Sequence, residues 1–522
     1  MIALVAQVGT LVAQAAGSKV TKLATPDVVW SALVPQLILM IGGVVMLTVV
    51  SLVSRHLPKG VYAGYTVAVA LASLISTIPL WHRVQNPREG ATGLVANAVG
   101  LDGFSLFSTG LICVGVILVA LLADGYLRRE GIDGPELYVL MLLSASGGTT
   151  MASANDLIVL FIGLEILSIS VYVLAAMHAR RLSSQEAGMK YFIMGAFASA
   201  FLLYGIALTY GATGSTNLGH IQRFLSEKVL LDDGMLLGGL ALMLVGLGFK
   251  VAAVPFHAWT PDVYQGAPSP VSGFMASVVK VSGFVGLIRV ISITFQAYVD
   301  QLRPILFALA ALSLVVGAVA AVVQTNVKRM LAYSSINHAG FILMGVQAGV
   351  IGTSPALFYL AAYSFMVIGS FGVVTLVGRR GDGRHALDDY KGLSRSRPAL
   401  ALAFAVFLLA QAGTPFTGGF LAKLGVIRAA TDTHNWTLAI IAMLTAVVSA
   451  FVYLRIVVAM YFPGEAGSAE GIDGPPVRVP WAAGLAVTLA VVGTLALGLV
   501  PQPFSGLADD AVAQIAGPTA TR

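Results

Sequence analysis

Charged residues are scarce in this sequence of 522 residues. Asp, Glu, Lys and Arg make up only 10% of it, whereas hydrophobic residues make up 57%, and the mean hydropathy is +0.88. Soluble globular proteins carry about 25% charged residues, so this sequence has too few charged residues to cover the surface of a water-soluble fold of this size. Apolar runs of about 20 residues, long enough to cross a hydrocarbon layer of about 30 Å, recur along almost the whole chain. The sequence therefore predicts an all-α polytopic membrane protein.

Cysteine is nearly absent as well. The single cysteine, Cys113, lies in the apolar run "LICVGVILV", where we expect a small core residue. Fe–S clusters need sets of cysteines and zinc sites need Cys or His in sets, so neither is predicted. The net charge of +6 is modest and no arginine stripe with interleaved aromatic residues accompanies it. Nucleic acid is therefore not an expected partner.

About fourteen stretches are long and apolar enough to be transmembrane helices, and the loops between them are short. Helices are expected because hydrocarbon offers backbone amides no other partner. Residues 1–27 precede these stretches, and we expect a short N-terminal segment near the membrane face. The predicted spans are 28–53, 61–81, 104–126, 137–154, 156–177, 189–211, 234–262, 267–296, 304–324, 329–350, 354–377, 398–427, 436–462 and 479–500.

The distribution of lysine and arginine among the loops predicts the orientation. With both termini outside, the cytoplasmic loops carry fifteen basic residues and the outer loops carry nine. The loop 379–397 supplies six of the fifteen, so the predicted orientation depends on this loop.

Two of the predicted spans contain helix-breaking residues. Proline removes one helix hydrogen bond and crowds the carbonyl one turn earlier. Interrupted helices at corresponding positions of two halves indicate a transporter built of inverted repeats. The helix-breaking residues are Pro255 in one span and Gly413, Pro415 and Gly418 in the other, where "AGTPFTGG" is expected to be unwound.

Two related units follow from these breaks. We expect the units to be flanked by accessory helices, with the last helix followed by a tail. The expected boundaries are 28–136 for the first three helices, 137–296 for the first repeat, 304–462 for the second repeat, and 479–522 for the last helix and the tail.

Five ionisable residues are candidates for burial within the spans. A charge at the centre of a membrane helix costs about 2.5–3.5 kcal/mol on insertion scales, so such residues usually face a hydrated interior and partner one another. An amine that has lost its water can load and release a proton as a carboxylate approaches or leaves. The sequence therefore predicts a proton relay made of Glu165, Lys190, Lys250, Lys280 and Lys423.

The depth of each candidate can be read from its position in its span. Glu165 lies nine residues past Asp156, about 13 Å along a helix, which is too deep for a short carboxylate to reach the lipid headgroups. Lys190 lies at the start of its span, so it is either a relay group or a lysine whose amine reaches the interface. Arg289 and Arg455 lie near span ends and are expected to be interfacial anchors.

Two histidines are candidates for continuing the relay, His338 and His257. His338 has Ser334, Ser335 and Asn337 as neighbours, so it could belong to a hydrogen-bonded chain or be a satisfied packing residue.

Two stretches carry a resemblance to a known family. "GFKVAAVPFHAWTPDVYQGAPSPVSGFMASVVK" resembles the signature of the antiporter-like subunits of respiratory complex I and of Mrp-type cation/proton antiporters. "EAGMKYFIMGAFASAFLLYG" resembles the subunit N branch of that family, in the proton-pumping NADH–quinone oxidoreductase. The similarity covers about residues 28–500.

The resemblance implies a fold and a role for each buried charge. The fold would have fourteen helices in which two five-helix repeats are inverted and the seventh and twelfth helices are broken. Glu165 would pair with Lys190, Lys250 would be the pumping lysine, Lys280 the connecting lysine and Lys423 the terminal group. Lysine at position 423 fits the subunit N and L branches better than M, and the chain ends without the long lateral helix of L.

The resemblance also implies cofactors and partners. NADH, FMN, Fe–S clusters and quinone, either menaquinone or ubiquinone, belong to other subunits, so this chain is expected to be a non-redox subunit of a proton-translocating NADH:quinone reductase. The expected partners are the neighbouring subunit M, the small subunits K and J, and lipids. The expected location is the inner membrane of a bacterium, which the chain crosses many times.

Three alternatives remain at this stage. A subunit of a multi-subunit Mrp-type sodium/proton antiporter shares the same motif around Lys250. An intramembrane hydrolase would use Ser334 or Ser335 with His338, but no GxSxG or HExxH stretch is present and the membrane lysines would have no task. A scaffold that only bridges its neighbours would leave the embedded charges unexplained.

Overall fold

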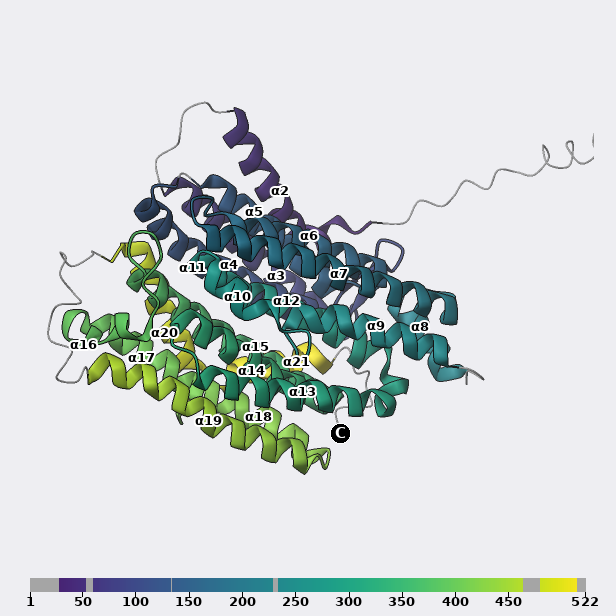
Figure 1. The fold of residues 1–522 in the computed structure, drawn as a ribbon. Helices are drawn as coiled ribbons and strands as arrows, with labels where there is room; N and C mark the ends of the chain where they lie inside the picture. The colour runs from purple at the N-terminus through teal and green to yellow at the C-terminus, as the bar shows by residue number, and fades with distance from the viewer. Residues whose placement is uncertain (1–27, 53–59, 133, 229–232, 463–478, 514–522) are drawn as a thin grey trace, which may run out of the picture.

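The computed structural model describes residues 28–52, 60–132, 134–228, 233–462 and 479–513. The predicted N-terminal segment, residues 1–27, lies outside the described residues. Within the described ranges the chain forms a bundle of helices, with the first half of the chain at the top of Figure 1 and the second half at the bottom. This bundle confirms the predicted all-α membrane fold.

The first seven predicted spans are helical in the structure. The helices bury small and apolar residues against one another and leave other apolar side chains on the outer surface of the bundle. They are α2 (Trp30–Leu52), α3 (Val61–Gln85), α4 (Gly103–Glu130), α5 (Pro135–Ser153), α6 (Leu157–Ala176), α7 (Leu182–Thr213), and the pair α9 (Gly234–Val251) and α10 (Trp259–Gly266).

The last seven predicted spans are helical as well. The eighth contains two π-helical segments, η1 and η2. The elements are α11 (Ser269–Phe274), η1 (Met275–Val279), α12 (Lys280–Ile288) and η2 (Arg289–Thr294), then α13 (Val299–Val322), α14 (Val327–Gln347), α15 (Val350–Val377), the pair α17 (Pro398–Ala412) and α18 (Gly418–Asp432), α19 (Trp436–Tyr461) and α20 (Trp481–Leu499).

Eleven of the described helices are each long and apolar enough to cross a membrane. The other three crossings differ for local reasons. α5 and α14 carry many polar residues, such as "SASGGTTMAS" and "SSINH", and α17 and α18 are short because a break divides their crossing. His338 and Lys423, two of the candidate residues, lie in these three crossings.

Polar residues at the loops cap several helices. The side chains of Asp102, Asp156, Asn326 and Asn435 accept hydrogen bonds from backbone N–H groups in the first turns of α4, α6, α14 and α19. Such caps satisfy donors that have no partner within the helix. They fix where these helices begin.

Short elements that the sequence did not predict complete the ends of the bundle. The strands β1 (Thr92–Leu94) and β2 (Val99–Leu101) form a small antiparallel hairpin. Asn97 in its turn accepts a hydrogen bond through its backbone carbonyl from Asn217, which caps α8. The other short elements are α8 (Leu218–Glu227), η3 (Gln296–Tyr298), η4 (Leu387–Tyr390), α16 (Leu393–Ser396) and α21 (Gln502–Ala513).

Both predicted helix breaks are confirmed. α9 ends at Val251 and α10 begins at Trp259, with Pro255 between them. In the second break, Gly413 follows α17 with φ +97°, a left-handed conformation that glycine adopts without strain. Pro415 lies in the unwound segment and Gly418 begins α18. The boundaries proposed for the two repeats stay a prediction.

The most buried helices lie in the middle of the bundle. Every residue of the apolar window within Ser269–Ser292 is buried, and nearly every one within Val350–Val377, whereas α2 and α3 are mostly exposed. The interior of the protein is therefore built around α11, α12 and α15. The candidate functional residues lie against this core.

Candidate functional site

Three of the predicted lysines are buried in the bundle. Lys250, Lys280 and Lys423 are 3%, 2% and 6% exposed. None of the three amines lies within ion-pair distance of a carboxylate among the described residues. The lysines that do are Lys190, Lys328 and Lys391. Their charges are therefore satisfied by hydroxyl groups, carbonyl groups and aromatic rings.

Lys250 lies in the last turn of α9, immediately before the first break. Its Nζ donates to Ser168 Oγ at 2.9 Å and to Tyr191 OH at 3.3 Å. The amine also lies 5.8 Å and 5.3 Å from the ring centres of Tyr172 and Tyr191, close enough for cation–π attraction. α6, α7 and α9 together hold this amine.

A small cavity lies beside Lys250, between α6, α7 and α9. It is lined by Ser168, Ser199 and Lys250 together with apolar residues, and it offers about 10 Å³ to the centre of a water molecule. One water needs about 10–15 Å³ of this kind of space and two or more polar partners. The cavity is therefore close to the size of one bridging water.

Glu165 lies on α6 and is half-buried. Its carboxylate accepts a hydrogen bond from Ser199 on α7, one of the residues that line the cavity beside Lys250. The predicted carboxylate and the predicted pumping lysine thus share one polar neighbourhood.

Lys190 does not pair with Glu165, so that implied pairing is wrong in this structure. Its Nζ lies 2.7 Å from a carboxylate oxygen of Glu186, one helical turn away, and 2.8 Å from one of Asp262 on α10. Asp262 also accepts a hydrogen bond from Arg329 at 2.6 Å. Because two nearer carboxylates take the amine, Lys190 joins an ionic cluster whose side chains are partly exposed.

Lys280 begins α12, directly after the π-helical segment η1. Its Nζ donates to the hydroxyl and to the backbone carbonyl of Ser335 on α14, both at 2.5 Å. The hydroxyl of Tyr363 on α15 donates to the same Ser335 hydroxyl at 2.9 Å. The amine therefore lies at the junction of three helices in the core.

His338 lies one turn beyond Ser334 on α14 and is buried. Its Nδ1 lies 2.7 Å from Tyr359 OH, and its Nε2 lies 3.2 Å from Tyr453 OH. The Tyr453 hydroxyl is in turn 2.5 Å from Ser334 Oγ. Both ring nitrogens are thus taken by tyrosines rather than by a serine, which argues against the hydrolase alternative.

Lys423 lies in the second turn of α18, just after the second break. Its Nζ donates to the carbonyl of Ala412, the last residue of α17, at 3.0 Å, and lies 4.9 Å from the ring centre of Phe341. The carbonyl groups at the end of a helix have no partner within that helix, so they can accept hydrogen bonds from other groups. The break therefore provides the partner of this amine.

One face of α14 connects the surroundings of Lys280 and Lys423. Ser335, His338 and Phe341 recur three residues apart and lie on one side of this helix. Ser335 contacts Lys280 and Phe341 contacts Lys423, with the His338 ring 4.9 Å from that of Tyr363 between them. The hydrogen bonds of the described residues do not join the two amines directly.

His257 lies in the first break and is half-buried, and its Nδ1 is buried without a hydrogen-bond partner. It contacts none of the three lysines through a hydrogen bond in the described part of the chain. Instead, Trp259 bridges the break by donating from its indole nitrogen to the Phe249 carbonyl at 3.1 Å. The relay role of His257 stays a prediction.

The two arginines predicted as interfacial anchors are tied to the protein. Arg289 is buried, and its Nη2 donates to both carboxylate oxygens of Asp102 at 2.8 Å, so its interpretation as a lipid-facing anchor was wrong. Arg455 donates to the backbone carbonyls of Val322 and Gln324 at the end of α13. Both arginines thus contact residues far apart from them in the sequence. Their positions within the predicted spans could not show these contacts.

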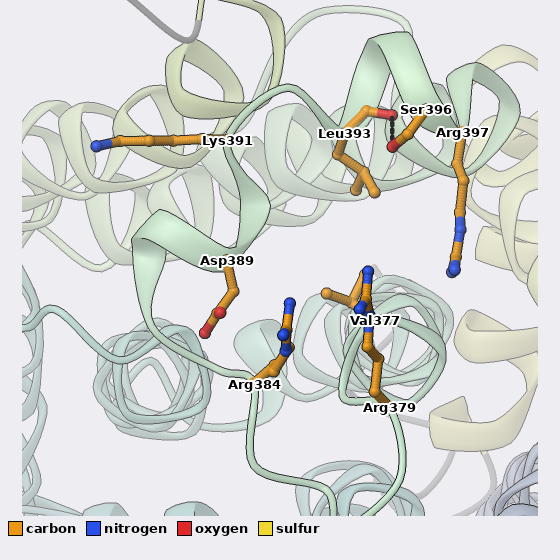
Figure 2. A pocket seen from close by; sticks show the side chains of 8 residues that line it. All are labelled: Val377, Arg379, Arg384, Asp389, Lys391, Leu393, Ser396 and Arg397. Atoms are coloured by element: carbon orange, nitrogen blue, oxygen red, sulfur yellow. Dashed lines mark hydrogen bonds between the residues drawn. The ribbon is translucent and has the colours of Figure 1, made fainter. Parts of the chain in front are cut away.

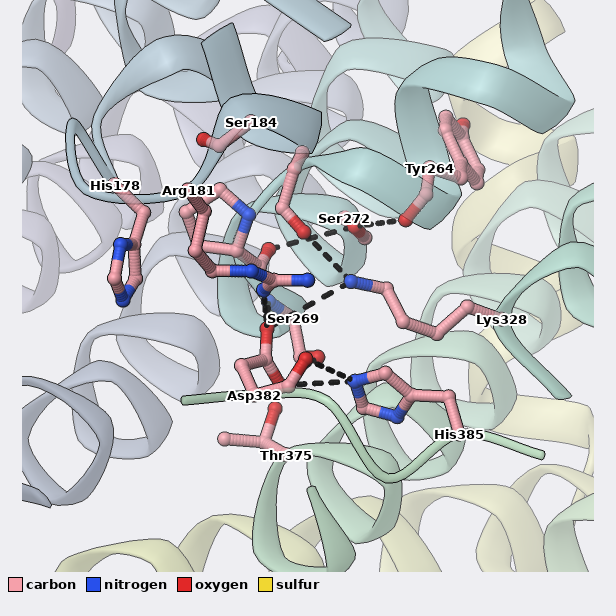
Figure 3. A network of polar contacts seen from close by, with 12 residues as sticks. His178, Arg181, Ser184, Tyr264, Ser269, Ser272, Lys328, Thr375, Asp382 and His385 are labelled. Carbon is pink, nitrogen blue, oxygen red and sulfur yellow. Dashed lines mark hydrogen bonds and ion pairs between the residues drawn. The ribbon is translucent and has the colours of Figure 1, made fainter. Parts of the chain in front are cut away.

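A second polar network, shown in Figure 3, was not predicted from the sequence. Asp382 follows α15 and is fully buried. It accepts hydrogen bonds from the hydroxyl of Ser269 at 2.7 Å and from His385 at 3.0 Å, and it pairs with Arg181 at 3.2 Å and Lys328 at 3.8 Å. Burial alone would raise the pKa of Asp382, but the charge of Lys328 and the hydrogen bond from His385 lower it below its ordinary value. This network ties the starts of α11 and α14 to the loop after α15.

The fold and the buried amines define an antiporter-like membrane subunit, and comparisons with known proteins agree. The family described as "NADH:quinone oxidoreductase/Mrp antiporter, TM" matches residues 154–449. A NADH-quinone oxidoreductase subunit N from Trichlorobacter lovleyi is 40% identical over 484 residues, which cover 92% of this chain and 96% of that relative.

Solved structures give the same result. A chain of respiratory complex I from Thermus thermophilus with bound aureothin has a TM-score of 0.75 at 34% identity, covering 90% of this chain and 98% of that one. A chain of the Mrp complex from Dietzia sp. has a TM-score of 0.79 at 22% identity, covering 94% and 98%, which shows a shared fold alone.

The chain belongs to the subunit N family of NADH-quinone oxidoreductase. It is therefore a subunit of an enzyme complex with several membrane subunits, and a multi-pass protein of the bacterial inner membrane. The Mrp-type antiporter is the more distant match.

Proposed function

We propose that this chain moves protons across the membrane through its buried lysines, driven by electron transfer from NADH to quinone in other subunits. The observation that carries the proposal is the burial of Lys250, Lys280 and Lys423 with no carboxylate paired to them in the described residues. An unpaired ammonium in a membrane interior is costly, and a chain that keeps three such groups is expected to use them.

The first station of the relay is Lys250 with Glu165. Two hydroxyl groups and two aromatic rings surround the amine, and each can stabilise its protonated form while leaving it free to release the proton. A water in the adjacent cavity would lie between the lysine and the serine that contacts Glu165. A change in the distance between amine and carboxylate would then load or unload the proton.

The second part of the relay runs from Lys280 to Lys423 along α14. Hydroxyl groups can accept a proton and pass another one on, and those of Ser335 and Tyr363 lie against Lys280. His338 with its two tyrosine hydroxyls is the further relay group that we assign on this face. Lys423 would be the terminal station, held by the carbonyl that the second break exposes.

Lys190 would act through charge rather than by carrying the proton itself. Its amine pairs with Glu186 and Asp262, and Asp262 also pairs with Arg329 on α14. A shift of the α10 segment after the first break would change this pairing. The cluster could therefore couple movement at the break to the relay, with Glu165 and Lys190 acting separately.

We propose that the redox cofactors lie outside this chain. NADH, FMN, Fe–S clusters and quinone would be held by other subunits, since one buried cysteine cannot ligate a cluster. Subunit M and the small subunits K and J would be the neighbours in the membrane, together with lipids. The chain would then be the translocating, non-redox part of the enzyme.

The test replaces Lys250 by methionine in the intact complex, reconstituted into liposomes. We expect quinone-dependent NADH oxidation and proton uptake into the liposomes to fall together by about tenfold or more, because a single missing proton station blocks the coupled cycle. Lys228→Met is the matched control, because this lysine follows α8, is exposed, and has its amine 5.2 Å from the ring centre of Phe224. Wild-type proton pumping by an assembled Lys250→Met complex would refute the proposed role.

A further inference from the structure

The loop between α15 and α17 forms a basic pocket at one end of the bundle, shown in Figure 2. The pocket offers about 40 Å³ to the centre of a water molecule, and its polar lining is mainly cationic. It is lined by Val377, Arg379, Arg384, Asp389, Lys391, Leu393, Ser396 and Arg397.

Within the described ranges, the acidic groups near this pocket are fewer than its cationic groups. Asp389 is the one carboxylate among the described lining residues, and it accepts a hydrogen bond from the backbone N–H of Ala386 at 2.8 Å. Asp388 pairs with Lys391 at 2.8 Å from outside the lining, and Asp382 belongs to the buried network of Figure 3. The described lining therefore has more cationic than acidic groups, with Arg379 and Arg397 among the cationic ones.

The positive groups crowd one another at the start of α17. Burial lowers the pKa of Arg397, and the charge of nearby Arg379 lowers it further. The first N–H groups of α17 have no acceptor within the helix, so the helix dipole adds positive potential at the same place. This combination of arginines and a helix start favours an anion.

The pocket lies where the protein surface passes from polar to apolar. Figure 1 places α16 and the start of α17 together at one end of the bundle. Beyond Arg397, the exposed residues of α17 are Pro398, Ala399 and Leu402, and Leu402 is 60% exposed. A phosphate at Arg397 would therefore lie beside exposed apolar side chains of α17.

We propose that this pocket binds the phosphate headgroup of an anionic phospholipid, whose acyl chains lie along the exposed face of α17. Basic pockets between membrane helices are suited to such headgroups, since several cations share one anion while the chains stay in the bilayer. Arg379 and Arg397 would contact the phosphate, and Arg384 and Lys391 would add charge at the rim. The inference does not depend on the proposed proton relay.

The test uses the intact purified complex in lipid nanodiscs containing a photoactivatable phosphatidylglycerol. We expect the probe to label peptides spanning residues 393–402 in the wild type. An Arg379→Gln/Arg397→Gln double variant should lose about 30-fold of this labelling, because about 1 kcal/mol per basic residue near a membrane surface amounts to about 2 kcal/mol for two residues. Arg380→Gln/Arg395→Gln is the control, since it removes two exposed cations of the same loop that do not line the pocket.

Three other outcomes would overturn the proposal. Equal loss of labelling in both double variants would mean general attraction to the membrane surface and no site. Full competition by inorganic phosphate would identify a site for a soluble anion. Absence of labelling in the wild-type complex would mean that a neighbouring protein subunit covers the pocket. An Arg379→Lys/Arg397→Lys variant that keeps most of the labelling would support a site that recognises charge.

Discussion

Replacing Lys280 by methionine is expected to leave the stability of the membrane domain unchanged or to raise it. The buried ammonium costs several kcal/mol of desolvation, and its hydrogen bonds to Ser335 return about 1.5–3 kcal/mol each. Methionine removes both terms and fills a similar volume, while Tyr363 still bonds to the Ser335 hydroxyl. The expected change lies between about 0 and 4 kcal/mol of added stability.

The structure offers a matched comparison in Lys328, which is equally buried but pairs with a carboxylate. Its Nζ lies 3.8 Å from Asp382 and donates to the Ala267 carbonyl at 2.6 Å. Lys328→Met would leave Asp382 in the core with one cation fewer. We expect a loss of about 3–5 kcal/mol, the usual effect of breaking a buried pair.

Hydrogen–deuterium exchange of the intact complex distinguishes the two lysines. A loss of about 3 kcal/mol raises the equilibrium constant for local opening by more than about 100-fold, so amides at the start of α14 should exchange much faster in Lys328→Met. In Lys280→Met, the amides of α12 and α14 should exchange at the wild-type rate or more slowly. Equal acceleration in the two variants would show that Lys280 is a structural lysine, and the reasoning would be refuted.

Two further predictions follow from the second break and from the Asp382 network. Gly413→Ala should cost about 1–2 kcal/mol and reduce proton pumping, because the left-handed backbone resists a side chain and the new methyl group would lie 3.2 Å from Lys423 Cδ. Gly381→Ala, at φ +85° in open space, has the same backbone strain without that contact and should pump normally. Asp382→Asn should destabilise the protein by about 3–5 kcal/mol at pH 7. Since the folded-state pKa of Asp382 is lowered, its contribution is present above about pH 4 and is lost as the pH falls further, so denaturation curves of variant and wild type should converge in acid. A stability difference that stays constant down to the acid limit would contradict the assigned ion pairing.

The membrane fold and both helix breaks could be predicted because their signals are local. A run of apolar residues specifies a crossing wherever it occurs, and proline or glycine breaks the helix at its own position. The burial of Lys250 and Lys280 followed from their positions inside apolar runs, and the burial of Lys423 followed from the break that shortens the path before it.

The pairing of charged groups could not be predicted, because it depends on which helices pack together. Lys190 and Asp262 are 72 residues apart, and Arg289 and Asp102 are 187 residues apart. The family resemblance implied Glu165 as the partner of Lys190, whereas packing brings two other carboxylates closer. Short elements such as the β1–β2 hairpin were missed because strands of three residues carry almost no periodic signal.

The exchange of protons at the buried amines is the central claim. Redox-triggered infrared difference spectra of the reconstituted complex, prepared with and without 15N-labelled lysine, test it most directly. We expect an isotope-sensitive ammonium signal to appear during turnover and to diminish when Lys250, Lys280 or Lys423 is replaced by methionine. A spectrum without isotope-sensitive lysine bands in a complex that still pumps protons would contradict the account.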